Sequence, residues 1–238
     1  LRNAVFVHDF ESPLLHKLTW PKVSWAPGLF DLDNDTDLDL FFANGHLNSV
    51  SGDNRQSNLL FENDGHGRFT DISETSGVLA TGDRIHRSAI FADYDDDGKV
   101  DIFVTVNGQQ VEDGQGNNIF DPNQGKGILF RNETKSDNNW IKVRLEGTKS
   151  NRDGFGATVS ITVSAIKHEQ ALVSGQGYFS AHAKEIYFGL GSIKLIDKIE
   201  ISWPSGIDQT FENIPTNQTV YIVEGETLHQ NTSHLSVK

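Results

Sequence analysis

The 238-residue sequence contains no cysteine and no methionine. The absence of cysteine excludes disulfide bonds, thiol chemistry and Cys-ligated zinc or iron–sulfur sites. No apolar run approaches the roughly 20 residues that a membrane-spanning helix needs, so the sequence predicts no membrane span. The missing methionine and the start at Leu1 lead us to expect a mature or trimmed product, or a fragment of a longer chain.

Positive charge is scarce, because 20 Lys and Arg stand against 33 Asp and Glu, for a formal net charge of −13. This balance argues against nucleic acid or an anionic membrane as a partner, since both attract basic patches. The acidity is concentrated in two segments, the first loop (residues 31–39) and the second loop (residues 93–101), with five aspartates each. Such clustering predicts a counter-cation rather than a generally acidic surface.

Motifs for catalysis are also missing from the sequence. Gly-x-Ser-x-Gly, His-Glu-x-x-His and a P-loop do not occur, and the nine histidines are scattered, without a close pair of metal-ligand spacing. The aspartates invite comparison with the paired carboxylates of a glycosidase, but their regular two-residue spacing fits cation ligation better. We therefore predict no catalytic residue and no enzyme.

What the chain does contain is a repeat. Residues 29–45 are echoed by residues 91–108, and a Leu-Phe-x-Asn sequence follows each, at 60–63 and 129–132. An apolar run of strand length comes after each acidic loop, and no stretch before residue 140 shows a helical period. The pattern predicts β units repeated every ~60–70 residues, as in propellers, solenoids and arrays.

The composition changes at the polar run 133–139, which we interpret as a domain boundary. We expect residues 1–136 to form the repeat region, residues 137–226 an independently folding β-sandwich or barrel, and residues 227–238 a polar tail. Trp140 and Trp203 lie in strand-like runs and are expected to be buried. The strand-like runs of this domain are 140–145, 157–163, 170–172, 185–188, 196–203 and 219–223.

The second loop carries the strongest chemical signal. Oxygen donors recur at its positions 1, 3, 5 and 9, and Gly98 at position 6 permits the positive φ of a sharp turn. A loop of this kind wraps a hard cation that needs six to eight oxygens, so we expect Ca²⁺ rather than Mg²⁺. A solvated acidic turn is the alternative. The predicted ligands are four carboxylates and one backbone carbonyl: Asp93, Asp95, Asp97, Asp101 and Lys99.

The first loop has the same donors, but Thr36 replaces the turn glycine. A β-branched residue at positive φ is unfavourable by about 1–2 kcal/mol, which predicts a distorted or weaker site. We therefore expect one or two calcium ions in all. The predicted ligands of the first loop are Asp31, Asp33, Asp35, Asp37 and Asp39.

These motifs resemble known families. The acidic loop followed by an apolar strand resembles the FG-GAP/VCBS repeat of integrin-type β-propellers. The segments 139–147, 150–157, 175–180, 186–191, 200–206 and 213–225 resemble the ASPIC/UnbV domain. The pairing of the two resembles the cartilage-acidic-protein-like family, which is common in bacteria. Because a closed propeller needs about four to eight blades, two repeat units imply an incomplete propeller followed by a small β-sandwich-like domain.

The resemblance implies a secreted or periplasmic, calcium-stabilised module without enzymatic activity, used for protein–protein contacts, scaffolding or assembly. The alternative is a carbohydrate-active or other secreted enzyme or accessory module built on a calcium-stabilised propeller. Two units alone leave sheet edges and apolar faces open. We therefore expect residues 1–136 to contact another protein chain or a missing part of their own chain, with carbohydrate as the alternative ligand.

Overall fold

The computed structural model describes residues 13–226 except 48–53, 109, 113–114, 116–117 and 121–124. The predicted polar tail lies outside the described residues. Strands make up 47% of the structure and helix 3%, so the predicted all-β class is confirmed. Within the described ranges, no helix has the length and apolarity needed to cross a membrane.

The first repeat unit is a four-stranded antiparallel sheet in the order β1-β2-β3-β4. Its bounds are β1 (Ser24–Phe30), β2 (Asp39–Asn44), β3 (Leu59–Asn63) and β4 (Phe69–Asp71). A short helix, α1 (Pro13–Thr19), precedes the sheet. The sequence shows no helical period before residue 140, because a helix of seven residues is too short to display one.

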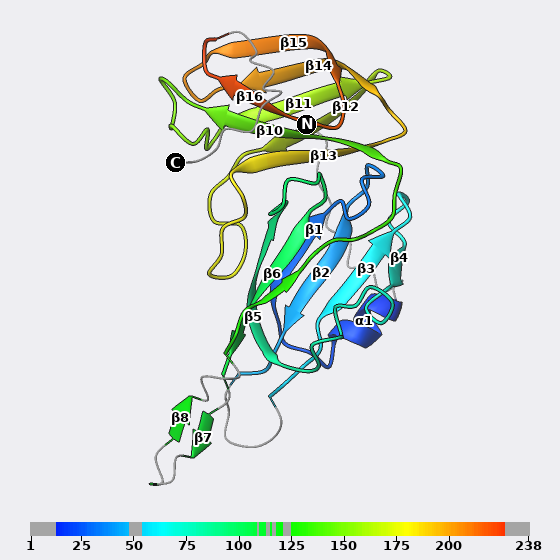
Figure 1. Cartoon of the computed structure of the whole chain (residues 1–238), viewed down its shortest axis with the longest axis vertical. Coiled ribbons are helices and arrows are strands. Elements are labelled where there is room, and N and C mark those ends of the chain that lie inside the picture. The colour runs from blue at the N-terminus through cyan, green and yellow to red at the C-terminus, as the bar shows by residue number, and fades with distance from the viewer. Residues whose placement is uncertain are drawn as a thin grey trace.

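The second repeat unit pairs β5 (Ile85–Ala92), β6 (Asp101–Asn107) and β9 (Ile128–Phe130) in the order β5-β6-β9. Its register repeats that of the first unit, since Phe30 pairs with Asp39 as Ala92 pairs with Asp101. A hairpin of β7 (Gln110–Glu112) and β8 (Asn118–Phe120) is inserted between β6 and β9 and projects from the far end of the repeat region (Figure 1).

The two repeat sheets pack face to face through aromatic rings. The Phe91 ring stacks on Phe30 with 4.8 Å between centroids and meets Phe41 edge-on at 6.0 Å. Phe91 also lies over Gly28, where an added Cβ would come within 2.0 Å of the ring. A glycine is therefore needed in β1 for the two sheets to approach.

The C-terminal half is a sandwich of two sheets, in the orders β13-β10-β16 and β12-β11-β14-β15. Apolar residues alternate along the strands and meet between the sheets, with Ile141, Ile161 and Ile199 fully buried. The strand bounds are β10 (Asn139–Glu146), β11 (Thr158–Val163), β12 (Ile166–Ala171), β13 (Glu185–Gly191), β14 (Leu195–Ser202), β15 (Asp208–Pro215) and β16 (Gln218–Val223).

Two sequence expectations for this half need correction. Strand β15 was not predicted, because its inward face carries only Phe211 partly buried and Ile214 fully buried. Trp203 is buried as expected, with 4% of its surface exposed, but Trp140 is only partly buried. The Trp140 indole lies against Gly98 of the second loop and not within the sandwich core.

None of the sheets in the described residues closes on itself. Figure 1 shows the two repeat sheets beneath the sandwich, with β13 as the sandwich strand next to them. The arrangement agrees with the predicted incomplete propeller followed by a β domain. The boundary at residues 136 and 137 remains a prediction.

Candidate metal centre

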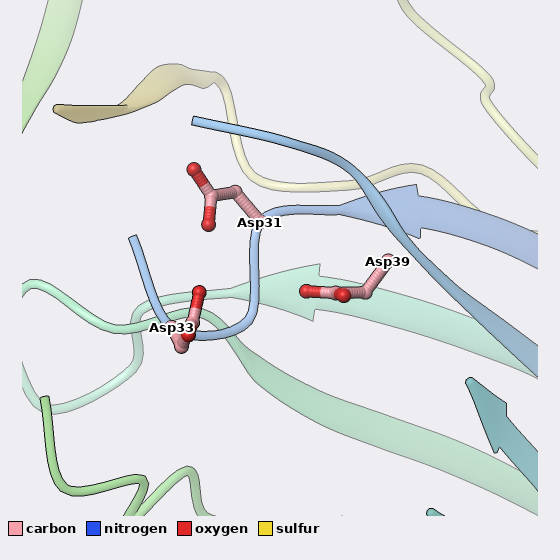
Figure 2. A group of neighbouring side chains, drawn as sticks. All are labelled: Asp31, Asp33 and Asp39. Carbon is pink, nitrogen blue, oxygen red and sulfur yellow. The ribbon is translucent and has the colours of Figure 1, made fainter. Parts of the chain in front are cut away.

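The first loop connects β1 to β2, and the second loop connects β5 to β6. Carboxylate oxygens of Asp31, Asp33 and Asp39 lie within 4.8 Å of one another, and Figure 2 shows these side chains gathered about the loop that follows β1. Oxygens of the corresponding residues in the second loop meet the same criterion. They belong to Asp93, Asp95 and Asp101.

The first aspartate of each loop closes the turn in the same way. Asp31 accepts hydrogen bonds from the backbone N–H groups of Asp35 and Thr36, both at 3.0 Å. Asp93 accepts them from Asp97 and Gly98, again both at 3.0 Å. The two turns therefore have the same internal hydrogen bonds.

The last aspartate of each loop is held by one N–H of its own loop and by one N–H at or just after the end of the neighbouring strand. Asp39 accepts hydrogen bonds from Leu32 N at 2.7 Å and Asn63 N at 2.9 Å. Asp101 likewise accepts from Tyr94 N at 3.0 Å and from Asn132 N at 2.7 Å. The two asparagines that end the Leu-Phe-x-Asn repeats thus position a predicted ligand. Their repetition was visible in the sequence, but their role was not predicted.

Thr36 does not distort the first loop. Its φ is 91°, against 88° for Gly98, and the residues at position 4 of the two loops, Asn34 and Asp96, have φ of 63° and 57°. The expected distortion is therefore absent, because the surrounding hydrogen bonds hold Thr36 in the glycine conformation. The weaker binding expected of the first loop stays a prediction.

Burial raises the pKa of several loop carboxylates, and the neighbouring aspartates add to the effect. It raises the pKa of Asp31 and of Asp39 to about 7, and that of Asp37 to about 6. The pKa of Asp101 is raised as well, again mainly by burial. One oxygen of Asp37 is buried without a hydrogen-bond partner. Clustered carboxylates with an orphaned oxygen fit a hard divalent cation, which favours such oxygen ligands.

Four predicted ligands lie outside the two groups of close carboxylates: Asp35, Asp37, Asp97 and Lys99. Asp35 and Asp97 each accept an N–H at 3.0 Å, from Asp37 and Lys99 respectively, and so brace the turns. The ligand roles of all four, including the backbone carbonyl of Lys99, remain predictions.

The two loops contact each other, and both also contact the C-terminal sandwich. Asn34 donates a side-chain hydrogen bond to Gly98 O at 3.2 Å, and Gly191 N donates to Asn34 O at 2.8 Å. Trp140 closes the second loop, since a Cβ added at Gly98 would lie 1.9 Å from the indole. The two loops therefore lie where the repeat sheets meet β10 and β13.

A buried polar network joins the second loop to these strands. The Lys142 ammonium lies 2.9 Å from Asp93 Oδ2 and also bonds Asp96. Arg144 bonds Glu185 and lies 3.3 Å from Asp96 Oδ1. None of the basic residues in this network was predicted from the sequence, because their partners lie about 40 or more positions away.

A cleft of about 480 Å³ lies between the first loop and the edge of the sandwich. Polar side chains that line it include Asp31, His168, His182, Glu185 and Tyr187. His182 Nδ1 accepts the Phe91 N–H at 3.3 Å, and burial lowers the pKa of His182, so its imidazole is neutral at pH 7. The volume lies within the range of small-molecule sites.

Comparison with known proteins identifies the class of the chain. Residues 31–104 match the FG-GAP-like repeat family, and residues 147–229 match the ASPIC and UnbV family. Both families that the motifs resemble are thus matched, which confirms the resemblance stated from the motifs. The chain is a β-repeat module.

The similarity extends to a particular relative. The chain is 26% identical over 177 residues to cartilage acidic protein 1 from Homo sapiens and equally to that from Mus musculus. The aligned region covers 74% of this chain but only 24% and 25% of the two relatives. The chain therefore spans about a quarter of the length of these relatives.

Proposed function

We propose that this chain is a non-enzymatic, calcium-stabilised β-repeat module that works outside the cytoplasm and docks onto another β-repeat unit. The names of the matched families and relatives denote no enzyme, and similarity to a protein named for cartilage supports the location. The docking role is carried by one observation, the unequal burial of equivalent faces in the two repeats.

In the first repeat, the face with Gly28, Phe41 and Leu60 is packed against the second repeat. The shared register makes Phe103 the counterpart of Phe41, and the Leu-Phe-x-Asn repeats make Leu129 the counterpart of Leu60. Phe103 and Leu129 pair across β6 and β9, yet remain 40% and 45% exposed. The second repeat thus presents to solvent the face that the first repeat buries.

The opposite face of the first repeat sheet is exposed at β1, whereas Leu59 and Phe61 of β3, on the same face, are buried. Leu29 is the counterpart of buried Phe91, and it is 60% exposed. The second repeat packs one face of its sheet on the first repeat. Another unit can pack the same face on the second repeat, so the occupant that fits is a β-repeat sheet of the same kind. Such head-to-tail contacts continue until a ring closes.

A second copy of the chain supplies such a sheet for testing. We expect sedimentation velocity to show association that grows with concentration and that Phe103→Ser weakens. The control is Ile166→Ser, which removes an exposed apolar side chain, 60% exposed, from the β11–β12 hairpin of the sandwich. A wild-type protein that stays monomeric at every concentration would contradict the proposed docking.

The calcium role is tested separately. Isothermal calorimetry on chelator-stripped, folded protein should show Ca²⁺ binding, with Mg²⁺ binding weaker because Mg²⁺ demands near-octahedral geometry and keeps its waters. Asp33→Ala and Asp95→Ala should each remove one binding event. A folded sample without any Ca²⁺ heat signal would refute this part.

The cleft beside the first loop favours a second candidate function, binding of a carbohydrate. It combines the raised pKa of Asp31 with the neutral His182. Calorimetric titration with neutral oligosaccharides, repeated on His182→Ala, separates the two candidates. Binding that the variant loses would support this second function, and absence of binding would remove it.

A further inference from the structure

The two loops share a frame but differ in their charge environment. The first loop contains five aspartates and no basic residue. Among the residues that the structure describes, no Lys, Arg or His forms an ion pair with any of these five carboxylates. Its negative charge is therefore not paired with a cation of the described residues.

The second loop is partly neutralised by basic residues, two of which bond its predicted ligands. Lys99 lies within the loop, Arg131 Nε lies 2.7 Å from Asp95 Oδ2, and Lys142 Nζ lies 2.9 Å from Asp93 Oδ2. The Lys142 side chain has no exposed surface, so its ammonium cannot withdraw into solvent. Both Asp93 and Asp95 are predicted ligands, and each therefore shares its charge with a protein cation.

The same strand pair faces the first loop without a cation. Gly189 of β13 is the partner of Trp140 in the β10–β13 ladder. A Cβ at Gly189 would come within 1.9 Å of Asp31 Oδ2, the atom that corresponds to Asp93 Oδ2. The sandwich thus presents an ammonium to one loop and bare backbone to the other.

We propose that Lys142 sets the calcium affinity of the second loop and makes it the weaker site, so that the first loop binds Ca²⁺ more tightly despite Thr36. An ammonium hydrogen-bonded to a ligand carboxylate repels an incoming divalent ion and reduces the charge that the carboxylate offers. Fewer effective ligand charges lower the affinity of a calcium loop. The inference rests on the proposed calcium binding and ranks its two sites.

The ranking is tested on the full-length chain by calorimetry. We expect two Ca²⁺ binding events in the wild type, the tighter one lost in Asp33→Ala and the weaker one lost in Asp95→Ala. Trp140 lies against Gly98, so Tb³⁺ luminescence excited through tryptophan provides a second readout for the second loop. That signal should weaken in Asp95→Ala without vanishing, because Trp140 also borders Asp33 and Asn34 of the first loop.

The role of Lys142 is tested by Lys142→Met, which keeps the length of the side chain and removes its charge. Ca²⁺ affinity of the second loop should rise by about tenfold, which corresponds to about 1.4 kcal/mol, with the first loop unchanged. Arg131→Gln removes an exposed cation with less risk to the fold and should produce a smaller rise. Arg152→Gln, an exposed position in the 151–154 turn, is the matched control and should change neither site.

The outcomes separate the two proposals. No Ca²⁺ binding by either loop refutes the calcium function and the ranking with it. Two binding events with the tighter one lost in Asp95→Ala, or an unchanged second-loop affinity in both Lys142→Met and Arg131→Gln, overturns the ranking alone. If Lys142→Met fails to fold, two other results decide the ranking. They are the assignment of the binding events by Asp33→Ala and Asp95→Ala, and the second-loop affinity of Arg131→Gln.

Discussion

The backbone conformation at Thr36 and Gly98 is set by the surrounding loop rather than by the type of residue. Both have a φ near 90°, although only glycine adopts such a backbone without strain. The cost of about 1–2 kcal/mol that a β-branched residue pays there is offset by hydrogen bonds from the loop to Asp31. Sequence reasoning located the strained position correctly, but it could not assess the compensation.

Gly98 has a second reason to be glycine, which Gly67 lacks. Both have positive φ, 88° and 78°, but an added Cβ meets the Trp140 indole only at Gly98. We expect Gly67→Ala to lower the free energy of unfolding by about 1 kcal/mol through strain. Gly98→Ala should cost about 1–3 kcal/mol more through overpacking. Chemical denaturation of both variants measures the difference, and equal losses would show that Trp140 moves aside freely.

Glu224 is a buried carboxylate held by five hydrogen-bond donors. Burial alone would raise its pKa, but bonds from the Ser205 hydroxyl and from residues 148–150 lower it from 4.5 to about 2. Its oxygens join the 147–150 segment and the 203–206 turn to the end of β16. Glu224 therefore stabilises the folded state only while it is ionised.

The sign of the pH dependence follows from the lowered pKa. The contribution of Glu224 is complete above pH 4.5 and is lost as the pH falls towards about 2. Glu224→Gln should lower the melting temperature at pH 7 by several degrees, and the two proteins should converge near pH 2. Glu212→Gln, at an exposed position of β15, is the control. A wild-type advantage that persists unchanged below pH 2 would contradict this role.

At the scale of elements, the sandwich has a core of its own. The buried cluster of this half runs from Ile141 to Ile222 and contains no residue of the repeat sheets. Strand β16 returns to pair in parallel with β10, which ties the end of the domain to its beginning. The contacts to the repeat region combine ion pairs and backbone hydrogen bonds with single aromatic rings, such as Tyr178 against Trp25.

We therefore predict that residues 137–226 fold independently. Circular dichroism should show strand content and a cooperative thermal transition. The fluorescence of Trp203 should be that of a buried indole, measured in the Trp140→Phe variant so that Trp203 is the emitting tryptophan. The isolated domain should be less stable than in the full chain, because Lys142 loses Asp93 and Asp96. A disordered-chain spectrum would refute the prediction.

At the scale of the whole molecule, the loops lie at the contact between the repeat sheets and the sandwich, so an ion bound there should stabilise both. Ca²⁺ at about one hundred times its dissociation constant should add about 2.7 kcal/mol per site to the free energy of unfolding. Thermal unfolding in Ca²⁺ and in chelator should show this as a higher melting temperature in Ca²⁺. Equal melting temperatures in a sample proven to bind Ca²⁺ would contradict it.

Much of the fold was predictable because its signals are local. Alternating aspartates, the strands that follow them and the repeated Leu-Phe-x-Asn are patterns over fewer than about ten residues, and the structure places most of them where the spacing indicates. Helix α1 and β15 escaped because one is short and the other lacks an apolar face.

The sequence by itself determined that the chain is all-β, that it repeats once, and that its two acidic loops offer oxygen donors at the spacing of a cation site. Only the tertiary structure decided which loop is neutralised, since the Lys142–Asp93 contact joins residues 49 positions apart and depends on how β10 meets the repeat sheets. It also decided that Phe103 is exposed while its counterpart Phe41 is buried. Both residues are apolar positions of equivalent strands, and burial follows from whether a neighbouring sheet covers them.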